Sequence, residues 1–405
     1  KTQNILYLVF NKAAEVSFHK QLRLGGCQNV RCMTFASFNG WITRGEEGVD
    51  LFTGSKVLWK NYHLRGGYYP FDTIIFDEAR SYVTRSVLQC LEVLEVTKKA
   101  RHLFLYDRSQ DILSSADTFS SCDELVEYLR KYCPDGEFVS YYFLPIVFRV
   151  PHEVHLQAAS HYMDTFYEGR TAVIKNDRTK FRDTMQWVTF PVNAPSNQRG
   201  LAEHISMDDV KYIQKFCDEE GISTPTGTKR KLYQWVKHAV VELCQKHVLT
   251  AIKALSESNS LEWKTCAILI LNSSHHVGEA PWDDPSRFRE TLLTYLKTHP
   301  ASRSWDFMTA EEGCKRMLGE NSENSEGEKF PIIVDSVGKF TGCEADYVIL
   351  VVNPSYNLQE LIQDKCRIYV GLTRAQNHLT VIAPENFLIR RPNHQVIEVD
   401  HVRLT

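Results

Sequence analysis

The chain has 405 residues, of which 43% are hydrophobic and 24% are charged, a composition typical of a soluble globular protein with two or three domains. Its formal net charge of -3 excludes a surface that is cationic throughout, so a nucleic-acid partner would have to be held by local basic patches. The sequence contains no apolar run of the roughly 18 residues that cross a bilayer and no signal peptide, which predicts an intracellular protein, nuclear or cytoplasmic, with no membrane partner. Its eleven cysteines include no CxxC pair, which predicts reduced thiols.

The first 140 residues predict an α/β domain. A short apolar run at Ile5 to Phe10 leads through Asn11 and Lys12 into a helical pattern. Further strand-like runs cover 30–35, 73–76 and 102–106. Strands that alternate with helical stretches predict a parallel sheet, with functional loops at the carboxyl ends of its strands.

Residues 141–405 predict a second α/β domain. Strand patterns recur at 265–271, 332–334, 347–352 and 379–382, with a helix at 287–298 between the first two. Residues of about 170–262 have mainly helical spacing and predict a helical insertion. The acidic, serine-rich stretch at about 320–329 lacks apolar residues and predicts a disordered loop.

The third apolar run of the first domain ends on two adjacent carboxylates, Asp77 and Glu78, in the sequence FDTIIFDEAR. A buried strand that ends on Asp-Glu is how P-loop ATPases hold Mg²⁺ and polarise the attacking water. The same pattern also occurs where a strand simply meets a polar helix start. A glycine-rich phosphate loop, GxxxxGK[ST], is absent from these 405 residues.

The run at 102–106 is followed by Asp107 and Gln110. In a nucleotide site, a glutamine at such a position hydrogen-bonds the γ-phosphate or orients water. The alternative is a helix cap at Asp107 and a solvated Gln110.

Two arginines and one turn complete the candidate nucleotide site. Arg149 follows the apolar run FLPIVF, and Arg374 follows a strand-like stretch at Ile368 to Leu372. Arginines placed in this way can add charge-assisted bonds to a triphosphate, although each can equally be an ordinary surface arginine. Gly342 and Glu344 form a turn before an apolar strand, where backbone amides and a carboxylate can face a ligand or merely turn the chain.

The stretches FDEAR, YDRSQ, FRVP, KFTGCEADYVIL and YVGLTRAQNHL occur in the order and approximate spacing of the motor motifs of superfamily 1 helicases. The chain resembles a UvrD/Rep-type helicase core along nearly its whole length. The VFRVPHE and DSVGKFTGCEADYVIL stretches also resemble the helicase-like domain of Schlafen proteins. Both resemblances imply two RecA-like domains with parallel sheets.

The helicase resemblance implies a role for each candidate residue. Asp77 would bind Mg²⁺, Glu78 would activate water, Gln110 would sense the γ-phosphate, and Arg149 and Arg374 would neutralise charge in the transition state. Asp107, Gly342 and Glu344 would line the ATP site. A second group would contact single-stranded DNA or RNA; it comprises Asn11, Lys12, Phe35, Phe38 and Thr341.

This sequence departs from the helicase pattern in three places. The phosphate loop is missing, Tyr106-Asp107 stands where Gly-Asp is usual, and Thr341 stands where a lysine is common. Phe35 and Phe38 have the alternative of being core residues. We expect a fragment of a longer, multidomain ATPase that begins after its phosphate loop, and the competing hypothesis is a helicase-fold regulatory or binding module without catalysis.

Overall fold

The structure is a computed structural model. It describes residues 3–38, 71–93, 100–107, 117–132, 146–147, 150, 173–174, 185–190, 207–225, 229–257, 265–272, 285–317, 329–353 and 365–384. The chain forms two compact units, with the main division between Pro145 and Ile146. Two later segments, Glu311–Glu323 and Gly338–Cys343, belong to the first unit.

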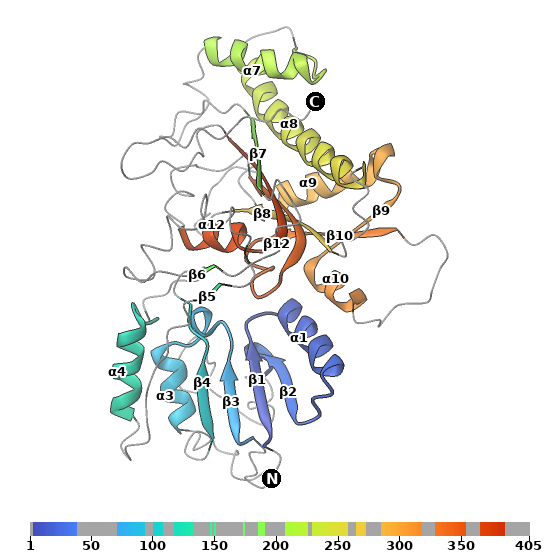
Figure 1. The fold of residues 1–405 in the computed structure, drawn as a ribbon. Helices are drawn as coiled ribbons and strands as arrows, with labels where there is room; N and C mark the ends of the chain where they lie inside the picture. The colour runs from blue at the N-terminus through green and yellow to red at the C-terminus, as the bar shows by residue number, and fades with distance from the viewer. Residues whose placement is uncertain are drawn as a thin grey trace, which may run out of the picture. The chain divides into compact units, whose positions relative to one another are not determined.

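The first unit contains a parallel four-stranded sheet ordered β2-β1-β3-β4 (Figure 1). Its strands are β1 (Ile5–Val9), β2 (Val30–Thr34), β3 (Thr73–Phe76) and β4 (Arg101–Phe104). Its helices are α1 (Lys12–Leu24), α3 (Arg85–Val93) and α4 (Cys122–Tyr132), with a 3₁₀ turn at Ala79–Ser81. Most of α10 (Ala310–Met317) also belongs to this unit.

Helices cover both faces of this sheet, and its two central strands, β1 and β3, are apolar on both sides. Successive residues of β1 point to opposite faces. Leu6 and Leu8 pack with Phe76 in a core that also includes residues of α3 and α4. Val9 and Tyr7, which lie on the other face, pack instead with Ala14 of α1.

The second unit is built on a parallel six-stranded sheet ordered β7-β12-β11-β8-β10-β9. Its strands are β7 (Met185–Phe190), β8 (Cys266–Leu271), β9 (Trp305–Met308), β10 (Phe330–Ser336), β11 (Ala345–Val352) and β12 (Ala375–Pro384). Its helices are α7 (Met207–Glu219), α8 (Lys229–Glu257), α9 (Pro285–Thr298) and α12 (Lys365–Leu372), with a 3₁₀ turn at Pro300–Ser302. A separate two-stranded pair joins β5 (Ile146–Val147) to β6 (Val173–Ile174).

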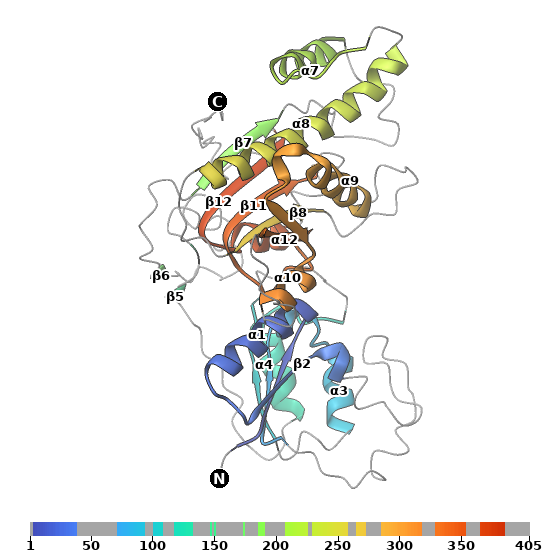
Figure 2. The same cartoon turned by 90° about the vertical axis from the view of Figure 1, so that its right-hand side faces the viewer.

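This second sheet is also covered on both faces. Residues of α7, α8 and α9 share one core with alternate residues of the central strands, such as Ile268 and Ile349, and Figure 2 shows α8 and α9 lying along that face. The helix α12 packs on the opposite face, because a Cβ atom added at Gly371 would lie 2.9 Å from Leu350 Cδ1. A Cβ atom this close would force the Leu350 side chain to shift, so glycine permits the close packing of α12 on the sheet.

The expected fold class is confirmed: the chain is α/β, with two parallel sheets of the kind found in RecA-like domains and an added helical part, α7 and α8. Two local predictions are wrong. Residues Ile368 to Leu372 form part of helix α12, because a short apolar run reads alike as strand or buried helix. Residues 185–190, within the expected helical insertion, form the edge strand β7. Among the described helices, none has the length and apolar character needed to cross a membrane.

Candidate functional site

Asn11, the residue directly before α1, connects two distant parts of the first unit. It has extended backbone angles and caps α1, because its Oδ1 accepts a hydrogen bond of 2.9 Å from the Ala14 amide. Its Nδ2 donates to the main-chain carbonyl of Thr341 at 2.6 Å. One side chain therefore holds both the helix start and the returning segment Gly338–Cys343.

The returning segment packs closely against the first turn of α1. Gly342 has a φ of +80°, a backbone conformation that residues other than glycine rarely adopt. A Cβ atom there would lie 3.1 Å from the Cβ of Ala14. Of the residues predicted to bind nucleotide or nucleic acid, the structure therefore brings Asn11, Thr341 and Gly342 together.

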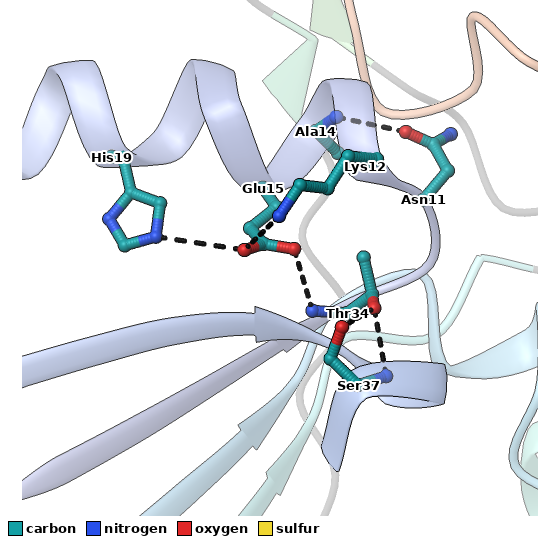
Figure 3. A network of polar contacts seen from close by, with 7 residues as sticks. All are labelled: Asn11, Lys12, Ala14, Glu15, His19, Thr34 and Ser37. Carbon is teal, nitrogen blue, oxygen red and sulfur yellow. Dashed lines mark hydrogen bonds and ion pairs between the residues drawn. The ribbon is translucent and has the colours of Figure 1, made fainter. Parts of the chain in front are cut away.

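Glu15 is the centre of a polar network on α1 (Figure 3). Its Oε1 lies 2.8 Å from Lys12 Nζ and 3.9 Å from His19 Nε2. Its Oε2 accepts a hydrogen bond of 3.1 Å from the main-chain amide of Thr34, at the end of β2. The Glu15 side chain is 9% exposed and that of Lys12 is 48% exposed, so a buried carboxylate holds a partly exposed ammonium group.

The same network fixes the start of the helical segment 35–38 that follows β2. The Oγ1 of Thr34 accepts a hydrogen bond of 3.0 Å from the Ser37 amide and lies 2.8 Å from Ser37 Oγ. Glu15 thus joins the start of α1 to the end of β2, because it binds Lys12 in one and Thr34 in the other.

The carboxylates Asp77 and Glu78 follow β3 at the same edge of the sheet. The Asp77 amide donates to the carbonyl of Leu8 at 2.8 Å, which anchors the strand end to β1. Glu78 has left-handed backbone angles, with φ 51° and ψ 38°. Its amide donates to Asp77 Oδ1 at 3.0 Å. A non-glycine residue in this region is strained, and such strain concentrates at functional sites.

The negative charge of Asp77 affects three weak acids around it. Burial, together with this charge, raises the pKa of the Tyr7 and Tyr82 hydroxyls well above the usual range. Burial, followed by the charges of Glu15 and Asp77, raises the pKa of the Cys32 thiol to about 12. All three groups are neutral at physiological pH, so they do not add to the local negative charge. A cation beside Asp77 would be stabilised by that charge.

Phe35 and Phe38 lie in the core and not on the surface. Phe35 is 2% exposed and Phe38 is fully buried. The Phe35 ring stacks on Tyr82 with a centroid distance of 4.7 Å. A base needs an exposed aromatic face to stack on, so in this conformation we assign both rings to packing.

Arg374 lies in the turn between α12 and β12 of the second unit. It is fully buried, and its Nε donates to the Val370 carbonyl at 3.0 Å. The assignment of Arg374 to a transition state stays a prediction.

The other predicted residues have varied positions. Asp107 is partly exposed just after β4, and Glu344 is exposed before β11. Gln110 and Arg149 lie outside the described residues.

Sequence reasoning missed Glu15, Tyr7 and Tyr82. Glu15 could have been found, because it follows Lys12 by three residues on a predicted helix, a spacing at which opposite charges pair. The hydrogen bond between the Tyr7 side chain and Asp77 had no comparable signal. It depends on the pairing of β1 with β3, which joins Tyr7 to Ile75, two residues before Asp77.

The predicted magnesium site rests on the carboxylate of Asp77. Among the described residues, no group of three or more His, Cys, Asp or Glu side chains is arranged to hold a metal ion. Mg²⁺ does not need such a group, since one carboxylate, water and phosphate oxygens complete its shell. Asp77 offers that carboxylate, but the described part of the chain contains no glycine-rich cradle for the phosphates.

Comparison with known proteins gives no family. No protein-family model matches the sequence, and no curated protein matches it. Among solved structures, the crystal structure of arterivirus nonstructural protein 10 (helicase) is similar over 94% of this chain, with 10% sequence identity and a TM-score of 0.34. The chain spans about half of that helicase, 54% of its length. A likeness this low carries no argument, so the fold assignment rests on the two parallel sheets themselves.

Proposed function

We propose that this chain is the motor core of an ATP-dependent helicase or translocase that acts on single-stranded DNA or RNA. The observation that carries the proposal is the edge of the first sheet. There, the ends of β1, β2 and β3 bring together Asn11 and Lys12, Thr34, and the Asp77-Glu78 pair. Ligands of parallel α/β sheets bind at this edge.

The proposed chemistry at this edge divides between two sets of residues. Asp77 would hold Mg²⁺, which would supply charge neutralisation to the phosphates of ATP, and Glu78 would accept a proton from the attacking water. Lys12 would contact the phosphodiester backbone. The strained backbone of Glu78 supports its role, since strain of this kind is retained where it serves function.

The returning segment supports a link between these two sets. Thr341 and Gly342 rest on α1 through Asn11 and Ala14. A change in the position of this segment would therefore reach the residues that precede Lys12. In a motor, such a contact would couple the state of the bound nucleotide to the affinity for single-stranded nucleic acid.

ATP hydrolysis tests the proposal. The natural polypeptide that contains these residues is assayed with and without oligothymidylate and oligouridylate. We expect hydrolysis that either single strand stimulates several-fold. A polypeptide that binds a single strand but does not hydrolyse ATP would instead be a binding module that keeps the motor fold.

A further inference from the structure

Lys12 and Glu15 form an ion pair on the first turn of α1. Lys12 is the basic residue of the predicted nucleic-acid contact, yet its Nζ lies 2.8 Å from a carboxylate of its own helix. A phosphate oxygen would have to share or displace that carboxylate. The pair therefore bears directly on how strongly Lys12 can bind a nucleic acid.

We propose that Glu15 competes with nucleic acid for Lys12. In the absence of single-stranded nucleic acid, Glu15 binds the Lys12 ammonium group and thereby lowers the affinity of Lys12 for the phosphate backbone. This inference rests on the nucleic-acid contact in the proposed function. The chemical class of the ligand is a phosphodiester, common to single-stranded DNA and RNA.

The geometry favours Glu15 as a fixed competitor. A surface carboxylate would rotate away at little cost, but Glu15 is held by the Thr34 amide through its second oxygen and is largely buried. Figure 3 shows its two oxygens turned to these different partners. Lys12, in contrast, is half exposed and flexible, so the lysine is the partner that can move to a phosphate.

The substitution Glu15→Gln separates the competition for Lys12 from the structural role of Glu15 at Thr34. The amide oxygen of glutamine can still accept the Thr34 hydrogen bond, whereas the negative charge that holds Lys12 is lost. We expect the variant to bind oligothymidylate and oligouridylate about fivefold more tightly at low salt, the upper end for an exposed ion pair. The plot of log K against log salt should steepen by about 0.7, the value for one additional phosphate contact on a single strand.

Asp72→Asn is the matched control. The Asp72 carboxylate also accepts one main-chain amide, that of Asn4 at 2.9 Å, but it precedes β3 at the opposite edge of the sheet. This variant removes the same charge from the same unit. We expect no change in the slope of log K against log salt for this variant. Equal slopes for both variants would mean that Glu15 acts only through the net charge of the protein, and would overturn the proposal.

A double-mutant cycle shows whether Lys12 carries the effect. In a Lys12→Ala background, Glu15→Gln should no longer tighten binding. An undiminished gain without Lys12 overturns the proposal, and so does unchanged or weaker binding by the single variant when the wild type binds normally. Neither result contradicts the proposed function. If both wild type and variant fail to bind single-stranded DNA and RNA, the nucleic-acid part of both proposals is wrong.

A measurement on the wild type covers the case in which the variant does not fold. With ¹³C-labelled lysine, the ε signal of Lys12 should shift when oligothymidylate is added, because the ammonium group changes its partner. An unchanged Lys12 signal in a protein saturated with the strand overturns the proposal.

Discussion

The side chain of Asn11 donates a hydrogen bond of 2.6 Å to the main-chain carbonyl of Thr341, 330 positions away in the sequence. The same side chain caps α1 through the Ala14 amide. Substitution can separate the two roles of this amide group, the hydrogen bond to Thr341 and the cap of α1. This makes Asn11 the clearest point at which to test whether the returning segment is fixed to the helix.

Replacement of Asn11 by serine should release the segment and keep the helix cap. Serine caps helices about as well as asparagine but lacks the amide donor that reaches Thr341. We expect Asn11→Ser to lower the free energy of unfolding by about 1 kcal/mol, the value of one hydrogen bond, and Asn11→Ala to cost about 1 kcal/mol more through the lost cap. Urea denaturation measures both values.

Amide hydrogen exchange locates the change. Exchange in residues 338–343 should rise in both variants, whereas exchange in the first turn of α1 should rise only in Asn11→Ala. Unchanged exchange in 338–343 for the serine variant would show that the hydrogen bond does not fix the segment.

Gly342 tests the packing of the same segment without removing a hydrogen bond. Alanine at this position would adopt a strained φ of +80° and place its Cβ 3.1 Å from that of Ala14. We expect Gly342→Ala to lower the free energy of unfolding by about 2–3 kcal/mol, from strain and overpacking together. Gly26→Ala is the matched control, because Gly26 also has a positive φ of +64° but open space around it.

The control should cost only about 1 kcal/mol, the strain alone. Equal costs in urea denaturation would mean that the segment yields to the added methyl group and does not pack tightly on α1.

The sequence was informative about the strands because strands of a sheet covered on both faces are continuous apolar runs. The run at 73–76 matches β3, and the run at 265–271 contains β8. Shorter or mixed segments were not predictable in this way. The stretch 368–372 joined a helix, and 185–190 became a strand through its pairing with β12.

The candidate site was predictable in position but not in contacts. Parallel topology places Asn11, Thr34 and Asp77 at one edge once the strands are known. Burial cannot be read from such positions: Phe35 turned inward against Tyr82. Contacts between residues distant in the chain, such as Asn11 with Thr341, follow only from tertiary structure.

Glu78 connects strain with chemistry. If Glu78 activates water, both Glu78→Gln and Glu78→Asn should abolish ATP hydrolysis by the natural polypeptide while ATP binding persists. The two variants should differ in stability, because asparagine populates the left-handed region more readily than glutamine. We expect Glu78→Asn to be more stable in urea by about 0.5–1 kcal/mol.

Hydrolysis by Glu78→Gln at the wild-type rate would remove Glu78 from the mechanism. Equal stability of the two variants would show that the φ of 51° at this position is not a source of strain.

His102 on β4 predicts a loss of stability in mild acid. Its Nε2 is buried without a hydrogen-bond partner among the described residues, and its ring meets that of Phe76 edge to face at 5.9 Å. Burial lowers the pKa of His102 to about 4, whereas a histidine in the unfolded chain has a pKa of about 6.5. Between these values the unfolded chain binds more protons, so stability falls as the pH falls.

The loss begins below about pH 6.5, reaches about 2 kcal/mol at pH 5 and is complete below about pH 4. Urea denaturation at pH 7 and pH 5 measures it, with His102→Gln as the comparison, since glutamine does not titrate in this range. The difference in the free energy of unfolding between the two pH values should shrink by about 2 kcal/mol in the variant. An equal difference in both proteins would mean that the folded protein accepts the proton at His102 as readily as the unfolded chain does.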